Sequence, residues 1–252
     1  MKAGIVGLPN VGKSTLFNCL SNTKAQSANF PFCTIEPNHS IINVPDKRLI
    51  TLQEIVNPEK LIPATVEIVD IAGLVKGASK GEGLGNKFLA NIRETDAIIH
   101  VLRCFDNDNI THVDGSVDPI RDKEIIDIEL QLKDLESLNN RLEKVSRTVK
   151  SGDKEAAREK EVLNQAISFI ESSNNIRSID LDEDDINKYL KPLQLITSKP
   201  VLYVCNVDEG SVTSTNSYVE SVKSLISDEG ANLIVLAAGI ESEINELEDY
   251  EE

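Results

Sequence analysis

Cysteine is scarce and long apolar runs are missing from this 252-residue sequence. Its four cysteines are far apart and form no CxxC pair, so the sequence indicates neither a disulfide framework nor a zinc site. No run approaches the ~18 apolar residues that a membrane span needs, and Pro9 ends the apolar segment from Ala3 to Leu8 too early for a signal peptide. We therefore expect reduced, mostly buried thiols, a cytoplasmic protein and no membrane partner.

Positive charge is also scarce, since 26 Lys and Arg stand against 42 Asp and Glu, a formal charge of −16. This balance argues against a general nucleic-acid coat and a sequence-specific DNA partner, because phosphate contacts require clustered basic side chains. The first 35 residues are an exception, with three lysines and no acidic residue. The first 35 residues could therefore still bind an anion. The acidic runs at 180–185 and 241–252 are typical of solvated surface.

A hydrophobic content of 40% with 27% charged residues is that of an ordinary globular protein and excludes a disordered or collagen-like chain. Short apolar runs rich in β-branched residues alternate with helical patterns. This alternation predicts an α/β fold with a mostly parallel sheet and helices on both faces. We expect buried strands at 2–7, 65–70, 97–103, 200–206 and 232–237, an edge strand at 40–44, and helices at 13–21, 84–94 and 217–229.

The alternation stops between about 121 and 195, where apolar residues recur at steps of three or four. The seam runs from Ile125 to Val145, and Lys150–Asp153 separates it from a second helical stretch at 155–172. We read an inserted antiparallel helical hairpin. The expected nucleotide domain is therefore 1–120 with 196–252, and the insertion is 121–195. The pattern fits equally a hairpin that packs on the domain and an arm that binds a partner.

Residues 7–14, GLPNVGKS, match the phosphate-binding pattern GxxxxGK[ST]. A predicted strand precedes them and a predicted helix follows, which is the context that this motif requires. Gly7 and Gly12 allow the backbone to wrap around phosphates, Lys13 reaches the β- and γ-phosphates as a catalytic residue, and the Ser14 hydroxyl ligates Mg²⁺. We therefore predict a P-loop nucleotide site.

A DxxG motif, Asp70 to Gly73, ends the second predicted strand. The Asp70 carboxylate would hold Mg²⁺ through water, the Gly73 N–H would sense the γ-phosphate, and Thr34 is a candidate second magnesium ligand. Leu74 stands where many GTPases have the glutamine that orients the attacking water, so hydrolysis needs another residue or is slow.

The strand at 200–206 ends in Asn206-Val-Asp-Glu209, where guanine-specific proteins carry NKxD. In NKxD the aspartate accepts hydrogen bonds from guanine N1–H and the exocyclic amine. Here Val207 replaces the lysine and Glu209 the aspartate, so we expect weak guanine selectivity and a preference for ATP over GTP.

Five segments together resemble the YchF or Obg-like ATPase family, a branch of the translation-factor class of P-loop GTPases: GLPNVGKST, NFPFCTIEPN, DIAGLVKGASKGEGLGN, RCFDNDNITHV and NVDE. The resemblance runs from residue 1 to about 245. It implies a GTPase fold with a helical insertion, slow ATP hydrolysis and a ribosome or ribosomal-subunit partner. Family members continue into a C-terminal TGS domain, which we do not expect within these 252 residues. By matching motifs, the resemblance implies that Mg²⁺ is bound by Ser14 and Thr34 and the base by Asn206 and Val207. It implies that the phosphates are bound by Asn10, Val11, Gly12, Lys13, Ser14 and Thr15.

Two further roles are hypotheses from the residues. Asn10 lies in the phosphate loop where an asparagine can ligate K⁺, so potassium is a candidate second cofactor beside Mg²⁺. His112, in the polar loop FDNDNITHVDG, is a candidate replacement for the absent glutamine. We expect His100 to be a hydrogen-bonded core residue and His39 to lie at the surface.

Two other functions compete with the ATPase. A P-loop kinase for a small molecule would need an arginine-rich lid, which we do not find in the sequence. A nucleotide-stabilised scaffold without appreciable hydrolysis is compatible with Leu74, and measured turnover separates it from the ATPase.

Overall fold

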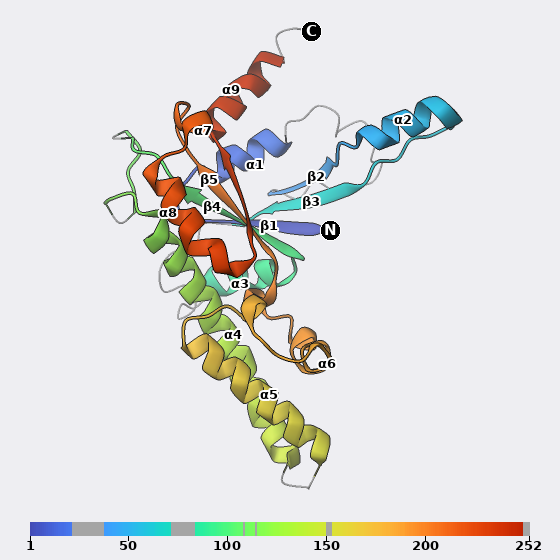
Figure 1. Cartoon of the computed structure of the whole chain (residues 1–252), viewed down its shortest axis with the longest axis vertical. Helices are drawn as coiled ribbons and strands as arrows, with labels where there is room; N and C mark the ends of the chain where they lie inside the picture. The colour runs from blue at the N-terminus through green and yellow to red at the C-terminus, as the bar shows by residue number, and fades with distance from the viewer. Residues whose placement is uncertain (22–37, 72–83, 108, 114, 150–152, 249–252) are drawn as a thin grey trace.

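The computed structural model describes residues 1–21, 38–71, 84–107, 109–113, 115–149 and 153–248. At its centre lies a six-stranded sheet in the order β2-β3-β1-β4-β5-β6 (Figure 1). Neighbouring strands are parallel except for β2, which pairs antiparallel with β3 at one edge. The strands are β1 Lys2–Val6, β2 His39–Asn43, β3 Thr65–Asp70, β4 Ala97–Arg103, β5 Val201–Asn206 and β6 Asn232–Leu236.

Every predicted strand is present, and the predicted α/β fold is confirmed. The strand predicted to be buried at 232–237 is not buried, because β6 lies at the other edge of the sheet and none of its residues is buried. The central strands β1 and β4 are almost continuously buried, as expected for parallel strands covered on both faces. No residue of β2 is buried, in keeping with its place at the sheet edge.

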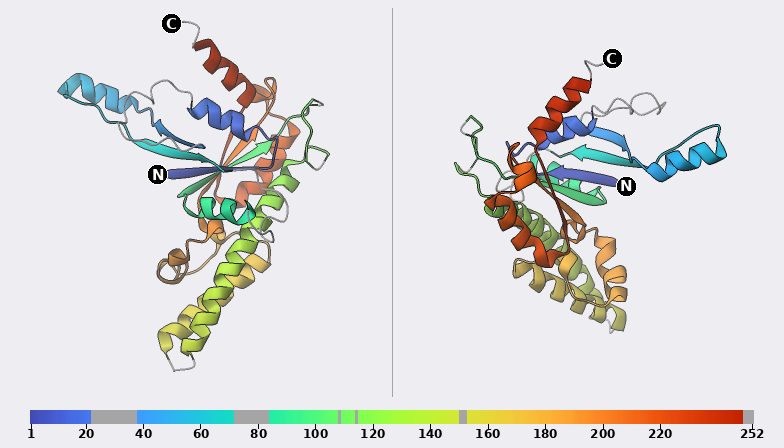
Figure 2. Two further views of the ribbon diagram at one scale, coloured as in Figure 1. Left: turned by 180° about the vertical axis from the view of Figure 1, so that it is seen from behind. Right: turned by 45° about the horizontal axis from the view of Figure 1, so that its top comes forward.

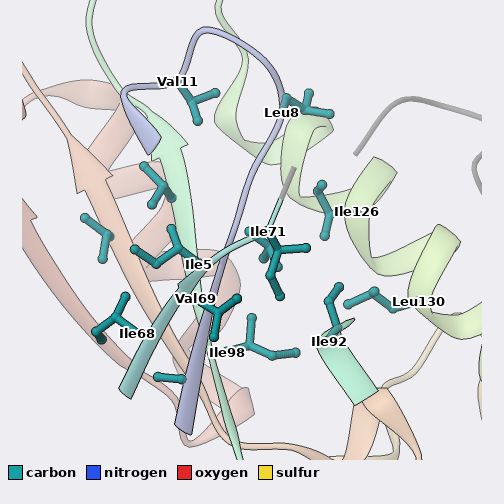
Figure 3. Packing of buried hydrophobic residues seen from close by; sticks show 14 of the residues in the cluster. Ile5, Leu8, Val11, Ile68, Val69, Ile71, Ile92, Ile98, Ile126 and Leu130 are labelled. Carbon is teal, nitrogen blue, oxygen red and sulfur yellow. The ribbon is translucent and has the colours of Figure 1, made fainter. Parts of the chain in front are cut away.

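Helices cover both faces of the sheet (Figures 1 and 2). On one face α1 packs against α9, and α3, α4 and α8 lie on the other. The main core forms where side chains of β1, β3 and β4 meet those of α3 and α4; Figure 3 shows Ile5, Ile98 and Ile92 with Ile126 and Leu130 of α4. The helices are α1 Lys13–Ser21, α2 Lys47–Val56, α3 Leu84–Arg93, α4 Pro119–Val149, α5 Lys154–Glu171, α6 Glu183–Asp185, α7 Ser211–Ser214, α8 Ser217–Ile226 and α9 Ala238–Glu248.

Helices α4 and α5 form the predicted antiparallel hairpin, which projects away from the sheet (Figures 1 and 2). Its outer part has its own core, in which Leu138 and Val145 of α4 pack with Val162 and Leu163 of α5. The Asp153 carboxylate caps α5 by accepting from the Glu155 and Ala156 N–H groups.

The inner part of α4 differs from the predicted seam. Ile126 and Leu130 pack into the main core of the α/β domain, whereas Ile128 and Leu132 are 50% and 38% exposed. The reason is that α4 contacts the sheet first and α5 only later, so its buried stripe changes position along its length. The boundary at 121 stays a prediction, although this part of α4 already belongs to the main core.

A chain of short helical turns leads from α5 back to β5. The fully buried Asp134 carboxylate of α4 anchors it by accepting from Ile196 N, Thr197 N and Thr197 Oγ1 at 2.7 to 2.8 Å. Burial raises the pKa of Asp134, and these three donors oppose the rise. The turns are η1 Ile176–Ser178, η2 Ile186–Leu190 (a π-helix), η3 Lys191–Leu193 and η4 Ile196–Ser198, and η5 Ser227–Glu229 follows α8.

Helix α2 was not expected from the sequence. It lies between β2 and β3 and extends beyond the sheet edge with no buried residue (Figure 1). Asp46 caps its start through Arg48 N, and Asn57, in the left-handed conformation, ends it. The capping interactions therefore fix where this helix begins and ends, and none of its residues is buried in a hydrophobic core.

Cys19, Cys104 and Cys205 are buried free thiols, as expected, and Cys33 lies outside the described residues. Within the described ranges, no helix combines the length and the apolar character that a membrane crossing requires.

Candidate nucleotide-binding site

The loop at residues 7–12 connects β1 to α1 at the carboxyl edge of the sheet. Close packing requires glycine at both its ends. A Cβ on Gly7 would lie 2.8 Å from the Val101 carbonyl oxygen, and one on Gly12 would lie 2.2 Å from Nδ2 of Asn206. Gly12 also has a φ of +93°, which only glycine adopts at low cost. The loop thus has the backbone freedom that wrapping a phosphate demands.

Lys13 and Ser14 both meet Asp70 at the start of α1. The Lys13 ammonium forms an ion pair with Asp70 Oδ1, and the Ser14 hydroxyl lies 3.5 Å from Asp70 Oδ2. Lys13 is only 8% exposed. The three residues predicted to serve the phosphates and Mg²⁺ therefore lie together, although they come from two segments 56 residues apart.

A hydroxyl and a carboxylate are the hard oxygen donors that Mg²⁺ prefers, so the residues present fit this ion. Mg²⁺ is usually held by one or two protein oxygens with nucleotide phosphates and water completing the shell. In agreement, the described part of the chain contains no cluster of three or more His, Cys, Asp or Glu residues that could hold a metal by themselves.

Asn206 joins the phosphate loop to the opposite side of the site. Its Nδ2 donates to the Val11 carbonyl at 2.9 Å, and its Oδ1 accepts from Ala238 N at 2.9 Å. The side chain is buried, and the next residue, Val207, donates its N–H to the Leu236 carbonyl at 2.9 Å. These bonds show that Asn206 holds the phosphate loop against the start of α9, and its predicted contact with the base stays a prediction.

A cavity of about 480 Å³ lies beside the phosphate loop. Three further parts of the chain line it: residues 105–107 and 110 after β4, residues 206–209 at the end of β5, and residues 237–240 and 243 after β6. Strand ends on one edge of a parallel sheet converge there, which is where ligands of such sheets bind. The described lining includes four acidic side chains and no basic one: Asp106, Asp208, Glu209 and Glu243.

The acidic side chains of the cavity and the positive charge of Lys13 lie in different parts of the site, so they suit different parts of a nucleotide. Carboxylates repel phosphates but accept hydrogen bonds from amino groups, so the cavity suits a base and ribose, while Lys13 suits the phosphates. Val207 and Glu209 of the strand-end motif line this cavity, and the predicted contact of Val207 with the base stays a prediction. The segments at 105–110 and 237–240 were not expected to contribute, because neither carries a recognisable base-binding pattern.

Asn10 and Thr15, two of the predicted phosphate-binding residues, also reach this cavity. Asn10 has a positive φ of 63° and donates from Nδ2 to the Thr111 carbonyl at 3.1 Å. The phosphate loop is therefore tied directly to the loop that carries His112.

His112 lies in the loop that follows β4, but its side chain does not face solvent. It is buried, and its Nε2 lies 2.8 Å from Oδ2 of Asp122 at the start of α4. A histidine paired with a buried carboxylate is held firmly in one orientation. Its role in hydrolysis stays a prediction, and any such role would require it to leave this contact.

The other histidines have structural positions. His100 is a core residue as expected; its Nε2 has no hydrogen-bond partner among the described residues, and whether the ring is hydrogen-bonded through Nδ1 stays a prediction. Burial lowers its pKa to about 4. His39 is partly exposed at the sheet edge and lies 3.0 Å from Glu67. Thr34, Gly73 and Leu74 fall outside the described residues, and their roles stay predictions.

A family profile and individual proteins similar to this chain point to the same family. Residues 2–140 match the sequence profile of the family described as 50S ribosome-binding GTPase. Ribosome-binding ATPase YchF of Haemophilus ducreyi is 53% identical over 99% of this chain and 68% of that protein. The protein of the same name from Bacillus subtilis is 53% identical over 100% of this chain and 69% of its own length.

Among solved structures, the Schizosaccharomyces pombe YchF GTPase matches with a TM-score of 0.84 and 37% identity. The match covers 98% of this chain and 68% of that one. It includes both the α/β domain and the hairpin, since nearly the whole chain is aligned.

Proposed function

The chain belongs to the YchF family, and from this membership we propose that it is a ribosome-binding ATPase of the cytoplasm. In this proposal it binds ATP with Mg²⁺, hydrolyses it slowly to ADP and phosphate, and changes its affinity for the ribosome with its nucleotide state. The observation that carries the proposal is that Lys13, Ser14 and Asp70 lie together at the phosphate loop, beside a cavity of about 480 Å³ lined by Val207 and Glu209.

Phosphate binding is assigned to the backbone of residues 10–15 and the Lys13 ammonium. The N–H groups at the start of α1 and the lysine provide positive charge for the β- and γ-phosphates. Ser14 and Thr34 would ligate Mg²⁺, and Asp70 would hold one of its waters. Bound there, the ion neutralises charge on the phosphates. Gly73 would complete the site by donating its N–H to the γ-phosphate.

Base selection is assigned to Val207 and Glu209. A guanine site needs a carboxylate placed to accept from N1–H and the C2 amine, and glutamate is one methylene longer than the aspartate of NKxD. Adenine has no N1–H, but its C6 amine can donate to a backbone carbonyl such as that of Val207. The loss of a hydrogen bond to a charged group costs about 1.5–3 kcal/mol, roughly 10- to 150-fold in affinity. The proposal therefore includes a preference for ATP over GTP.

Isothermal titration calorimetry on the parent protein tests this proposal. We expect ATP to bind at least tenfold more tightly than GTP in the presence of Mg²⁺, and Lys13→Met to abolish binding of both. The variant Val207→Lys, Glu209→Asp restores the guanine motif and should narrow the difference. GTP binding as tight as ATP binding in the parent would contradict the assignment.

Ribosome association is tested separately by co-sedimentation with ribosomes under ATP, ADP and no nucleotide. We expect the pelleted fraction to depend on the nucleotide. Equal pelleting in all three conditions would remove the switch from the proposal while leaving the ATPase in place.

A further inference from the structure

Arg103, the last residue of β4, is only 1% exposed. Arginine is almost never buried this deeply unless its polar head is paired. Its donors go to the main chain: Nε to Phe105 O at 3.1 Å, Nη1 to Ile110 O at 2.9 Å and Nη2 to Asn107 O at 3.2 Å. The guanidinium also lies 4.8 Å from the centre of the Phe105 ring. One side chain thus holds three carbonyl groups of a single loop.

These carbonyls belong to the loop after β4, whose residues 105–107 and 110 form one wall of the cavity beside the phosphate loop. Phe105, Asp106, Asn107 and Ile110 line the cavity, whereas Arg103 does not. Arg103 therefore acts on the cavity only through the loop that it supports.

The loop has little other support from regular structure, because neither a helix nor a strand includes residues 104–107 or 109–113. At its start, the Cys104 carbonyl accepts from Asn216 Nδ2 at 2.7 Å. Toward solvent, the Tyr218 hydroxyl lies 3.1 Å from both carboxylate oxygens of Asp106. Within the loop, Ile110 N also donates to the Asn107 carbonyl at 3.1 Å. The guanidinium adds the described bonds that connect both of these residues and Phe105 to the end of β4.

Only arginine has the geometry for this task. Its donors lie in one plane and point in fixed, divergent directions, so they can reach three carbonyls at once. The lysine ammonium is a single tetrahedral centre and cannot span the same positions. A methionine would fill the stem volume and leave the three carbonyls without this donor.

We propose that Arg103 is a positioning residue for the nucleotide base: by holding three carbonyls of the 105–110 loop, it sets the wall of the cavity and thereby the affinity and selectivity for the base. The proposal rests on the proposed nucleotide site. The proposal treats the affinity for the base and the affinity for the triphosphate as separate contributions, which the phosphate motif alone does not distinguish. Arg103 governs the contribution of the base, while the Lys13 region governs that of the triphosphate.

The test compares ATP, GTP and inorganic tripolyphosphate as ligands of the full chain, each with Mg²⁺, by calorimetry and competition. In Arg103→Lys and Arg103→Met we expect ATP affinity to fall at least tenfold and the ATP-to-GTP ratio to approach one. Tripolyphosphate affinity should change less than twofold. Amide hydrogen exchange should accelerate in the peptide covering 104–113 and not in the one covering 7–15.

Arg177→Lys is the matched control, since Arg177 is also a buried arginine, with its side chain 8% exposed, but pairs with Glu229 at 3.0 Å near the base of the hairpin. It should destabilise the protein without altering base selectivity. Unchanged ATP affinity in both Arg103 variants, or an equal loss for ATP and tripolyphosphate, would overturn the inference. If the parent fails to bind ATP, the proposed function fails instead, so the two failures are distinguishable.

Discussion

Asn206 occupies the space that any side chain on Gly12 would need: its Nδ2 would lie 2.2 Å from a Cβ at position 12. The same nitrogen donates to the Val11 carbonyl, so the glycine and the asparagine fit each other. The strand-end motif and the phosphate loop therefore form one structural unit, although they are far apart in the sequence.

We expect Gly12→Ala to reduce ATP affinity at least tenfold and to lower the free energy of unfolding by about 2–4 kcal/mol, the sum of backbone strain and a displaced hydrogen bond. Gly230→Ala separates these effects, because Gly230 has a φ of +62° but open space around its Cβ. It should cost only the strain, about 1 kcal/mol, and leave ATP binding unchanged. Calorimetry and denaturant unfolding of both variants provide the measurements; equal ATP affinities would contradict the account.

His112 can be tested against its partner. We expect His112→Ala to lower ATP turnover at least tenfold with little change in ATP affinity, and also to reduce stability, because Asp122 loses a buried partner. Asp122→Asn weakens the same contact while keeping the histidine. If both variants lose turnover equally, the histidine acts only through the fold, and a parent-like rate in His112→Ala would remove its catalytic role.

Potassium dependence tests the prediction for Asn10. We expect faster ATP turnover in K⁺ than in Na⁺ at equal ionic strength, since a monovalent cation beside the phosphates would stabilise charge that develops in the transition state. Asn10→Ala should abolish this difference. It also removes the bond to Thr111, so Asn10→Asp, which keeps an oxygen, is the informative companion. Equal rates in the two salts would contradict the prediction.

The hairpin can be shortened without touching the nucleotide site. Replacing residues 142–159 with a four-residue Gly-Ser linker removes the outer turns, and we expect ATP affinity to stay within threefold while ribosome co-sedimentation falls. Removing residues from 121 onward is a different experiment, because Ile126 and Leu130 pack in the main core, and it should prevent folding. A collapse of ATP binding in the folded shorter variant would place the hairpin in the pocket.

Stability should depend on pH through His100. Its native pKa of about 4 lies below the ordinary 6.5, so the unfolded chain binds the proton more readily. The stabilisation is fully present above pH 6.5 and declines as pH falls toward 4. Between pH 7.5 and 5 this group should cost about 2 kcal/mol of unfolding free energy. His100→Phe should remove that part of the decline in denaturant titrations; an unchanged pH profile would contradict it.

The centre of the sheet was predictable because β1 and β4 are almost continuously buried and therefore appear as continuous apolar runs. Ala97–Arg103 and Thr65–Asp70 have the predicted bounds. Helix α2 was not predictable in the same way, since it buries none of its residues and its apolar side chains, such as Ile55, face solvent. Periodicity identifies a helix only where one face is buried.

One part of the site was also predictable from the sequence and the other was not. The phosphate end was predictable from GxxxxGK[ST], because its chemistry fixes both residue types and spacing. The base end depends on where strand ends converge, and the contribution of Ala237 and the first residues of α9 has no local pattern. The protein contacts of Asn206 likewise follow from tertiary structure alone.

Helix α4 is continuous over 31 residues, from the His112 contact at Asp122 to the tip of the hairpin. At 1.5 Å per residue it is about 46 Å long. A tilt of only about 5° at its first turn would displace the far end by roughly 4 Å, more than a hydrogen bond tolerates. The first turn of α4 contacts His112, whose loop is bonded to the phosphate loop through Asn10 and Thr111. A rotation of α4 too small to disturb the sheet would therefore produce a large displacement at the far end of the helix.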